Sequence, residues 1–217
     1  METRIESLNK KYEPLSPEER VKELYKDFSE VLLTSSFGTN SVYLLHLISQ
    51  VKPVQRICFL DTTYHFPETL AYKNLIVKTL NLNILSLQGE TTRNVFTASD
   101  KTWARDPDLC CSINKVEPLE RIKPGFEVWV SGLMRSQNAN RSAIKIFSEQ
   151  QGMLKFHPLA DISQEQMDLY IEQNNLPVHP LKTAGFDSVG CIHCTVKGRA
   201  REGRWENKSK SECGLHI

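Results

Sequence analysis

Four of the six cysteines in this chain of 217 residues have the spacing of metal ligands. Cys110 and Cys111 are adjacent, and Cys191 and Cys194 form a CxxC pair. Adjacent cysteine side chains diverge in most backbone conformations, so this pattern favours a [4Fe–4S] cluster, which offers several separate irons, over one zinc ion. Zinc stays open as an alternative. A redox pair of the thioredoxin type is disfavoured, because GCIHCTVKG does not open a helix after a strand.

Cys213 stands apart from these four, in the sequence ECGLHI at the end of the chain. Many basic residues precede it, and a thiol near basic groups has a lowered pKa and is nucleophilic. The segment 188–217 has few apolar residues and no apolar periodicity, so we expect it to be mobile. An unreactive surface cysteine is the alternative interpretation. Six basic residues stand in the region before Cys213: Lys197, Arg199, Arg201, Arg204, Lys208 and Lys210.

Three polar loops are candidates for binding an anionic ligand. The first, TSSFGTNS over 34–41, combines hydroxyl groups with Gly38 between a predicted strand and a predicted helix, which is typical of a phosphate site. It lacks the lysine of a Walker loop, and an ordinary capped turn is the alternative. In FLDT, Asp61 could accept hydrogen bonds from ribose or adenine, whereas His65 is interpreted as packing. In SGLMRSQNANR, Arg135 could hold a phosphate, and Arg141 is expected to be a solvated surface residue.

The elements that must position these loops follow a strand–helix rhythm. Apolar runs at 30–36, 54–61, 82–87 and 127–132 predict strands, and 16–30, 40–51, 67–80 and 162–175 predict helices. This order predicts an α/β fold with a mainly parallel central sheet flanked by helices, whose ligand site lies beyond the carboxyl ends of the strands. We expect a nucleotide-binding domain over 1–187, which includes the CC pair, and a CxxC segment with a mobile catalytic tail over 188–217.

The overall composition excludes several classes of protein. Hydrophobic residues make up 40 % and charged residues 24 % of the chain, with a net charge of +1. These values are ordinary for a globular protein and argue against a nucleic-acid binder. No apolar run approaches the roughly 18 residues of a membrane span. The charged N-terminal segment lacks the apolar region of a secretory signal, so we expect a cytoplasmic protein.

Together these segments resemble the iron–sulfur branch of the sulfonucleotide reductases, the adenosine 5′-phosphosulfate reductases. The resemblance runs from SSFGTNS through FLDT, CCSINK, SGLMRSQ, KFHPLADIS and GCIHCT to REGRW and ECGLH, in this order. It implies an adenine nucleotide alpha hydrolase-like fold with a modified PP-loop that no longer splits ATP. Asn40 departs from the pattern, since an acidic residue is expected there.

The resemblance also implies roles for particular residues. Cys213 would be the nucleophile, Lys115 would link cluster and substrate sulfate, and Arg201 and Arg204 would face the sulfate. The cluster ligands would be Cys110, Cys111, Cys191 and Cys194. The nucleotide-contacting residues would be Ser35, Ser36, Phe37, Gly38, Leu60, Asp61, Gly132 and Arg135.

The implied activity is the reduction of adenosine 5′-phosphosulfate to sulfite and AMP in sulfate assimilation, through an S-sulfocysteine on Cys213. Thioredoxin, or a glutaredoxin-like dithiol, would be the reductant, and a homo-oligomer is possible. The 3′-phosphorylated nucleotide, alone or in dual use, is the close alternative. An ATP-using PP-loop tRNA thiolase or ligase is more remote, since Phe37 stands where SGGxDS would place a glycine.

Overall fold

The computed structural model describes residues 2–206, 210 and 212–215, and its centre is a six-stranded sheet. The strand order is β3-β2-β1-β4-β6-β5, and only β5 runs antiparallel to its neighbour. This confirms the predicted α/β fold. Lys208 and His216, which belong to the basic cluster and to ECGLHI, lie outside the described residues. The strands are β1 Val31–Ser35, β2 Arg56–Leu60, β3 Asn83–Leu87, β4 Val128–Val130, β5 Phe147–Gln150 and β6 Met153–Phe156.

The sheet order places a ligand site next to β1. The chain runs from β1 outward to β2 and β3, and β4 then returns to the other side of β1. Leu33 of β1 pairs with Ile57 on one side and with Val130 on the other, and all three are fully buried. Loops that leave β1 and β4 therefore diverge at their carboxyl ends, which is where a crevice opens in sheets of this type.

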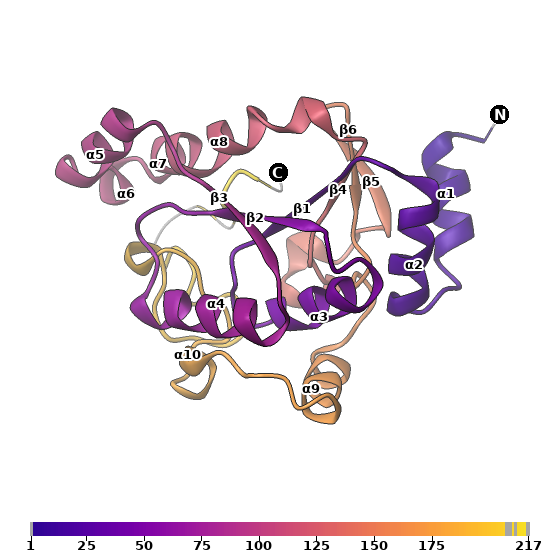
Figure 1. The fold of residues 1–217 in the computed structure, drawn as a ribbon. Coiled ribbons are helices and arrows are strands. Elements are labelled where there is room, and N and C mark those ends of the chain that lie inside the picture. Colours follow the sequence, from indigo (N-terminus) through magenta and orange to yellow (C-terminus); the bar gives the residue numbers. More distant parts are fainter. Residues whose placement is uncertain (1, 207–209, 211, 216–217) are drawn as a thin grey trace.

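Helices cover both faces of the sheet (Figure 1). In this view α3 and α4 lie below the strands with α9 and α10 beyond them, and α5, α7 and α8 lie above. The last described residues run between the upper helices and the sheet. The α-helices are α1 Arg4–Tyr12, α2 Pro17–Asp27, α3 Ser41–Val51, α4 Pro67–Thr79, α5 Thr91–Ser99, α6 Thr102–Arg105, α7 Pro107–Cys111, α8 Glu117–Glu120, α9 Gln164–Gln173 and α10 Pro180–Thr183.

The predicted helices and strands agree with the structure to within a few residues. The serines predicted to cap two of the helices do so. Ser16 caps α2 and forms a capping box with Glu19, and Ser163 does the same for α9 with Gln166. Each such cap satisfies backbone N–H groups that a helix leaves unpaired. The β5–β6 hairpin, α1 and the short helices between 91 and 120 were not predicted from the sequence.

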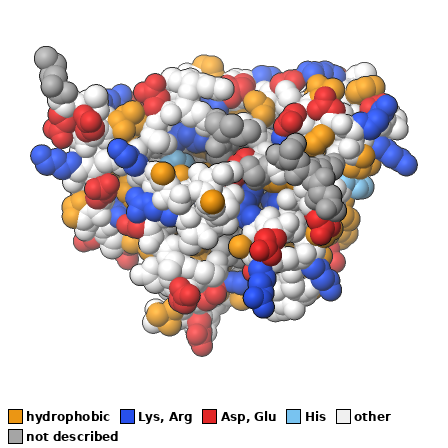
Figure 2. Space-filling model, turned by 180° about the vertical axis from the view of Figure 1, so that it is seen from behind, with side chains coloured by type: hydrophobic (Ala, Val, Ile, Leu, Met, Phe, Trp, Pro, Cys, Tyr) orange, Lys and Arg blue, Asp and Glu red, His pale blue; other side chains and the backbone are white. Residues whose placement is uncertain are grey.

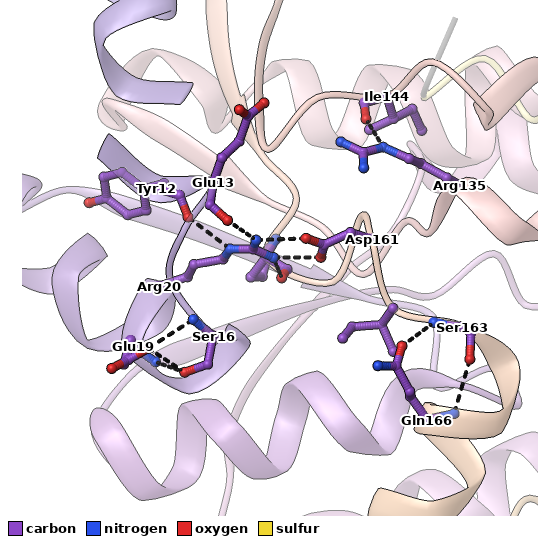
Figure 3. A network of polar contacts seen from close by, with 12 residues as sticks. Tyr12, Glu13, Ser16, Glu19, Arg20, Arg135, Ile144, Asp161, Ser163 and Gln166 are labelled. Atoms are coloured by element: carbon purple, nitrogen blue, oxygen red, sulfur yellow. Dashed lines mark hydrogen bonds and ion pairs between the residues drawn. The ribbon is translucent and has the colours of Figure 1, made fainter. Parts of the chain in front are cut away.

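A buried arginine ties the N-terminal helices to the sheet (Figure 3). Arg20 is 2 % exposed and forms two hydrogen bonds to the Asp161 carboxylate, of 2.6 and 2.7 Å. Its remaining N–H groups donate to the carbonyl oxygens of Tyr12, Glu13 and Pro158. Asp161 lies just before α9, so this network connects α2 to the segment that leaves β6.

No helix among the described residues is both long enough and apolar enough to cross a membrane.

Candidate active site

A pocket of about 530 Å³ opens at the carboxyl ends of β1, β2 and β4. Its walls come mainly from the loops after these strands and from three segments of the C-terminal region, 187–191, 200–205 and 212–215. Ten of the residues predicted as site residues line it: Ser35, Ser36, Gly38, Leu60, Lys115, Gly132, Cys191, Arg201, Arg204 and Cys213. The fold therefore brings the C-terminal cysteine to the same pocket as the loop after the first strand.

The SSFGTNS loop is held in shape by its own residues. Phe37 has a φ of 50°, a left-handed conformation that is uncommon for a side chain of this size. Its ring is fully buried against Phe59, and its N–H donates to the Ser35 hydroxyl at 3.1 Å. Burial of the Phe37 ring thus stabilises a backbone conformation that glycine would adopt with less strain. The N-terminus of α3 follows directly, so its backbone amides add partial positive charge to this wall.

Gly38 allows another backbone segment to approach the loop. A Cβ atom at this position would lie 3.4 Å from the carbonyl oxygen of Val189. The neighbouring Thr39 hydroxyl donates to the carbonyl oxygen of Asp187 at 2.5 Å. The loop after β1 is therefore fastened to the segment that leads into the CxxC pair.

Three buried nitrogen atoms of pocket residues have no hydrogen-bond partner among the described residues. They are Nδ1 of His65, Nε of Arg204 and Nε1 of Trp205. The Arg204 guanidinium lies over the Trp205 ring at 4.5 Å and fills the space beside Gly190, where a Cβ would lie 2.1 Å from its Nη2. Buried polar atoms are nearly always paired in proteins, so these atoms indicate a polar ligand, to which the N–H groups of Arg204 and Trp205 would donate.

Lys115 lies at the junction between the pocket and the cysteines. Its side chain forms a hydrogen bond to Cys191 and lines the pocket. Burial lowers the pKa of Lys115, but the charges of Cys191, Cys111 and Cys213 outweigh burial and raise it above its usual value. The group is therefore a fixed cation beside two pocket cysteines.

The residue before Cys213 anchors the end of the chain. Glu212 accepts hydrogen bonds from Arg141 Nε and Nη2 at 2.7 and 2.6 Å, from Arg201 Nη2 at 3.1 Å and from Asn138 Nδ2 at 3.3 Å. Burial raises the pKa of Glu212, but Arg141, Arg201 and Asn138 together outweigh this effect, and the pKa lies below its usual value. The expectation that Arg141 is a solvated surface residue is wrong: it is only 6 % exposed, because it is paired with Glu212.

Lys155 is a second buried cation near this segment. It is 4 % exposed, lies 4.3 Å from the centre of the Trp129 ring and donates to the carbonyl oxygen of Leu215 at 3.2 Å. Burial and the nearby charge of Lys123 lower the pKa of Lys155 to about 8. Burial and Arg141 lower the pKa of Arg201 to about 10, so Arg201 remains cationic at neutral pH.

The four predicted ligand cysteines lie in one region, and none of them forms a disulfide. Cys110 and Cys191 share a buried cluster with Tyr64, and Cys194 packs against it. Cys111 is also buried, and the charges of Cys191 and Cys213 act on it. Within the described part of the chain, no three Cys, His, Asp or Glu side chains are arranged to hold a metal ion. The donor set itself, four thiols in apolar surroundings, fits the ligand chemistry of an iron–sulfur cluster.

Three predicted nucleotide contacts do not line the pocket. The Phe37 side chain is in the core. Asp61 accepts from the N–H of Thr63 at 3.0 Å and from Gln88 Nε2 at 2.8 Å. Arg135 donates through Nε to the carbonyl oxygen of Ile144 at 2.7 Å (Figure 3). Their predicted contacts with the nucleotide stay predictions.

Several pocket residues were not identified from the sequence. His65 was interpreted as packing, and Arg141, Trp205 and Glu212 were given no role at the site. Lys155, which contacts Leu215 beside the pocket, was also given no role. Only Glu212 carried a local signal, because it directly precedes the candidate nucleophile. Trp205 and Lys155 belong to the motifs REGRW and KFHPLADIS, but nothing in these motifs assigned the two side chains a role. His65 and Arg141 lie far from Cys213 in sequence, and only the fold brings them to the pocket.

Charged side chains of both signs lie on the face of the molecule shown in Figure 2. On the face shown in Figure 2, Lys and Arg side chains are interspersed with Asp and Glu side chains over the part of the chain drawn in colour. Nucleic-acid binders instead gather positive charge on one face.

Comparisons with known proteins agree on one family. Residues 30–197 match the family described as the phosphoadenosine phosphosulfate reductase domain. The phosphoadenosine 5′-phosphosulfate reductase of Gloeobacter violaceus is 36 % identical, with 100 % of this chain and 95 % of the relative covered. The adenosine 5′-phosphosulfate reductase of Bacillus mycoides is 37 % identical over 89 % of this chain and 86 % of the relative.

Solved structures support the same fold. The phosphoadenylyl-sulfate reductase of Candida auris, a phosphate complex, has a TM-score of 0.77 and 28 % identity, covering 88 % of this chain and 96 % of that chain. The FMN adenylyltransferase of Candida glabrata has a TM-score of 0.61 at 14 % identity, covering 90 % of this chain and 68 % of that chain. The second likeness concerns the fold alone.

Proposed function

Because the chain belongs to the phosphoadenosine phosphosulfate reductase domain family, we propose that it reduces adenosine 5′-phosphosulfate to sulfite and AMP in sulfate assimilation. One observation carries the chemical part of this proposal. Cys213 lies in the same pocket as the SSFGTNS loop, Lys115 and Arg204. Nucleophilic attack on an anionic sulfonucleotide requires these groups: a nucleophile, a loop that binds phosphate, and cations.

The pocket cations make the approach of two negative groups possible. The nucleotide carries negative charge on its phosphate and sulfonate groups, and the attacking Cys213 thiolate brings another. Lys115 and Arg204 neutralise the sulfonate oxygens, while the amides at the start of α3 and the Ser35 and Ser36 hydroxyls hold the phosphate. Each charge-assisted hydrogen bond in such a site contributes on the order of 1–3 kcal/mol.

The first chemical step transfers the sulfonate group to the protein. The Cys213 thiolate attacks the sulfur of the mixed anhydride, an S–S bond forms, and the bond from sulfur to the phosphate oxygen breaks. AMP leaves with that electron pair, and Cys213 becomes an S-sulfocysteine. Lys115 and Arg204 stabilise charge on the transferring group, as fixed cations do in other group-transfer sites.

The second step releases sulfite with the help of an external dithiol, for which thioredoxin or a glutaredoxin-like protein is proposed. One thiolate of the dithiol attacks the Cys213 sulfur, the S–S bond to the sulfonate breaks, and sulfite leaves with the electron pair. The second thiol then displaces Cys213 from the mixed disulfide. The dithiol is oxidised to a disulfide, the sulfur of the sulfonate is reduced by two electrons, and the Cys213 thiol is restored.

We assign Cys110, Cys111, Cys191 and Cys194 as the residues that would hold a [4Fe–4S] cluster. Such a cluster would supply a fixed charge and a rigid support beside Lys115, whose hydrogen bond to Cys191 links this region to the pocket. The thiols and the external dithiol account for both electrons, so the chemistry above needs no change in the cluster's redox state. An EPR signal that appears and decays within each turnover would contradict the proposal that the redox state of the cluster stays unchanged.

The test of the function uses protein purified without oxygen and incubated with adenosine 5′-phosphosulfate in the absence of a dithiol. Intact mass and peptide mapping should show one sulfonate adduct on Cys213, and a dithiol added later should release one equivalent of sulfite. The C213S variant should form no adduct. Cys58, which is buried in β2, provides the matched control, since C58S should still form it. Absence of an adduct on wild-type protein would overturn the proposal.

The 3′-phosphorylated nucleotide is the alternative substrate, because the relatives from Gloeobacter violaceus and Candida auris carry names for that activity. Parallel assays of both nucleotides, compared by kcat/KM, decide between the two or reveal dual use. Release of pyrophosphate from ATP would instead indicate an ATP-using enzyme of related fold.

A further inference from the structure

We propose that Arg141 and Glu212 form a latch that positions the Cys213 thiol for attack and stays closed while the nucleotide is bound. The latch consists of these two residues together with Lys155 and the Leu215 carbonyl group. For its role in turnover this inference rests on the proposed function. The closed position of Cys213 is a property of the free protein and can be tested without any nucleotide.

The contact between Arg141 and Glu212 is a bidentate ion pair that is almost completely removed from water. The two side chains are 7 % and 8 % exposed, and the two hydrogen bonds are 2.7 and 2.6 Å long. Breaking such a pair from one side leaves an uncompensated buried charge, which is strongly unfavourable. Glu212, next to Cys213, is therefore held firmly in place, although the segment has few apolar residues to pack against the core.

A second contact lies on the other side of the cysteine. Lys155 donates to the Leu215 carbonyl oxygen at 3.2 Å, and the ring of Trp129 in turn flanks its amino group. Gly214 lies between the anchors with a φ of 83°, a conformation that favours glycine. Cys213 thus stands between two attachment points, one on the loop after β4 and one on β6.

The latch also determines which pocket cations would bind the substrate. Arg141 is committed within the protein: its Nε and Nη2 donate to Glu212 and its Nη1 donates to the Gln137 side chain. Arg204, in contrast, has a buried Nε without a partner among the described residues. Glu212 in this position cancels charge on Arg141 and Arg201 and leaves Arg204 and Lys115 for the sulfonate. The opposite arrangement, in which Glu212 is a plug that the incoming nucleotide displaces from Arg141, makes contrary predictions.

The first test measures how fast Cys213 is alkylated in the free protein. Iodoacetamide labelling of wild-type protein is followed by peptide mass spectrometry, and the E212Q and R141Q variants are compared with it. We expect each to raise the rate at Cys213 at least tenfold, and the double variant to add little, because the two residues act as one unit. E206Q is the matched control: the same chemical change at an exposed residue of the same segment should alter the rate less than twofold. An unchanged rate in E212Q would overturn the latch.

The second test separates positioning from nucleotide binding. With adenosine 5′-phosphosulfate, E212Q should form the S-sulfocysteine at least tenfold more slowly at saturating nucleotide, with a KM within about threefold of wild type. E212D, which keeps the charge, should recover part of the rate. If Glu212 were a plug, E212Q would lower the KM and leave the saturated rate unchanged, and this result would also overturn the proposal.

The two tests keep the latch and the proposed function distinguishable. If wild-type protein forms no adduct, the proposed function fails, whereas the alkylation rates still report on the latch. If wild-type protein forms the adduct and E212Q neither exposes Cys213 nor slows its attack, the latch fails and the function stands.

Discussion

The amino group of Lys115 forms a hydrogen bond to the thiol of Cys191, so one residue joins the cysteine cluster to the wall of the pocket. The two residues are 76 positions apart in the sequence. Lys115 follows the CC pair on the same stretch of helix, and Cys191 opens the CxxC pair. A change at Lys115 should therefore affect the pocket without removing a cluster ligand.

The K115Q variant should form the S-sulfocysteine about 10²–10³-fold more slowly, because a fixed cation at the transferring group is lost. Rapid-quench mass spectrometry at saturating nucleotide measures this rate. K197Q, at an exposed position in the C-terminal segment, serves as the control and should react at the wild-type rate. An unaltered rate in K115Q would show that its amino group makes no contact with the reacting sulfonate.

Replacement of a proposed cluster ligand should be visible without any activity assay. Protein purified without oxygen should be brown and contain about four irons per chain if a [4Fe–4S] cluster is bound. C191S should lose the colour and most of the iron, whereas C213S should keep both. Equal iron content in C191S and wild type would remove Cys191 from the ligand set.

The G190A variant should disturb the pocket through Arg204. A methyl group at Gly190 would lie 2.1 Å from the Arg204 Nη2 atom, so the guanidinium group has to move. A displacement of about 1 Å at a reacting site can lower kcat/KM by about 10²-fold. G125A is the matched control, since nothing lies within 4 Å of a methyl group at that glycine. If both variants had wild-type kcat/KM, the position of Arg204 would be irrelevant to turnover.

The buried Arg20 should contribute to stability rather than to activity. The R20Q variant leaves the carbonyl oxygens of Tyr12 and Pro158 without their donor, and we expect the free energy of unfolding to fall by about 3 kcal/mol. Urea denaturation measures it. K22Q, which breaks an exposed ion pair with Glu18 on the same helix, should cost no more than about 0.5 kcal/mol. Similar values for the two variants would contradict the role assigned to Arg20.

The same network gives a dependence of stability on pH. The hydrogen bonds from Arg20 hold the pKa of Asp161 below its usual value in the folded protein. A carboxylate with a lowered folded pKa stabilises the protein above its unfolded pKa of about 4, and this contribution is lost as the pH falls toward the folded pKa. D161N should therefore be less stable than wild type at neutral pH, and the difference should shrink in urea denaturation below about pH 4. A difference that is independent of pH would contradict this assignment.

Much of the secondary structure, the helix caps and the cysteine motifs of this protein could be predicted from its sequence. The strand and helix periods, the capping boxes at Ser16 and Ser163 and the motifs around the cysteines each depend on residues that are close together in the chain, so their pattern can be recognised without a fold. The same holds for the loop after β1 and for the nucleophilic character expected of Cys213. These patterns were sufficient to predict the α/β fold and the family resemblance.

Only the tertiary structure decided which of these residues meet. Arg141 and Glu212 are separated by 71 residues, and Lys155 and Leu215 by 60, so no local pattern links either pair. Arg141 was predicted to be a solvated surface residue, because burial of a charge depends on a partner that only the fold supplies. The sheet order, which sends β4 back beside β1, opens the pocket and brings these distant partners to Cys213.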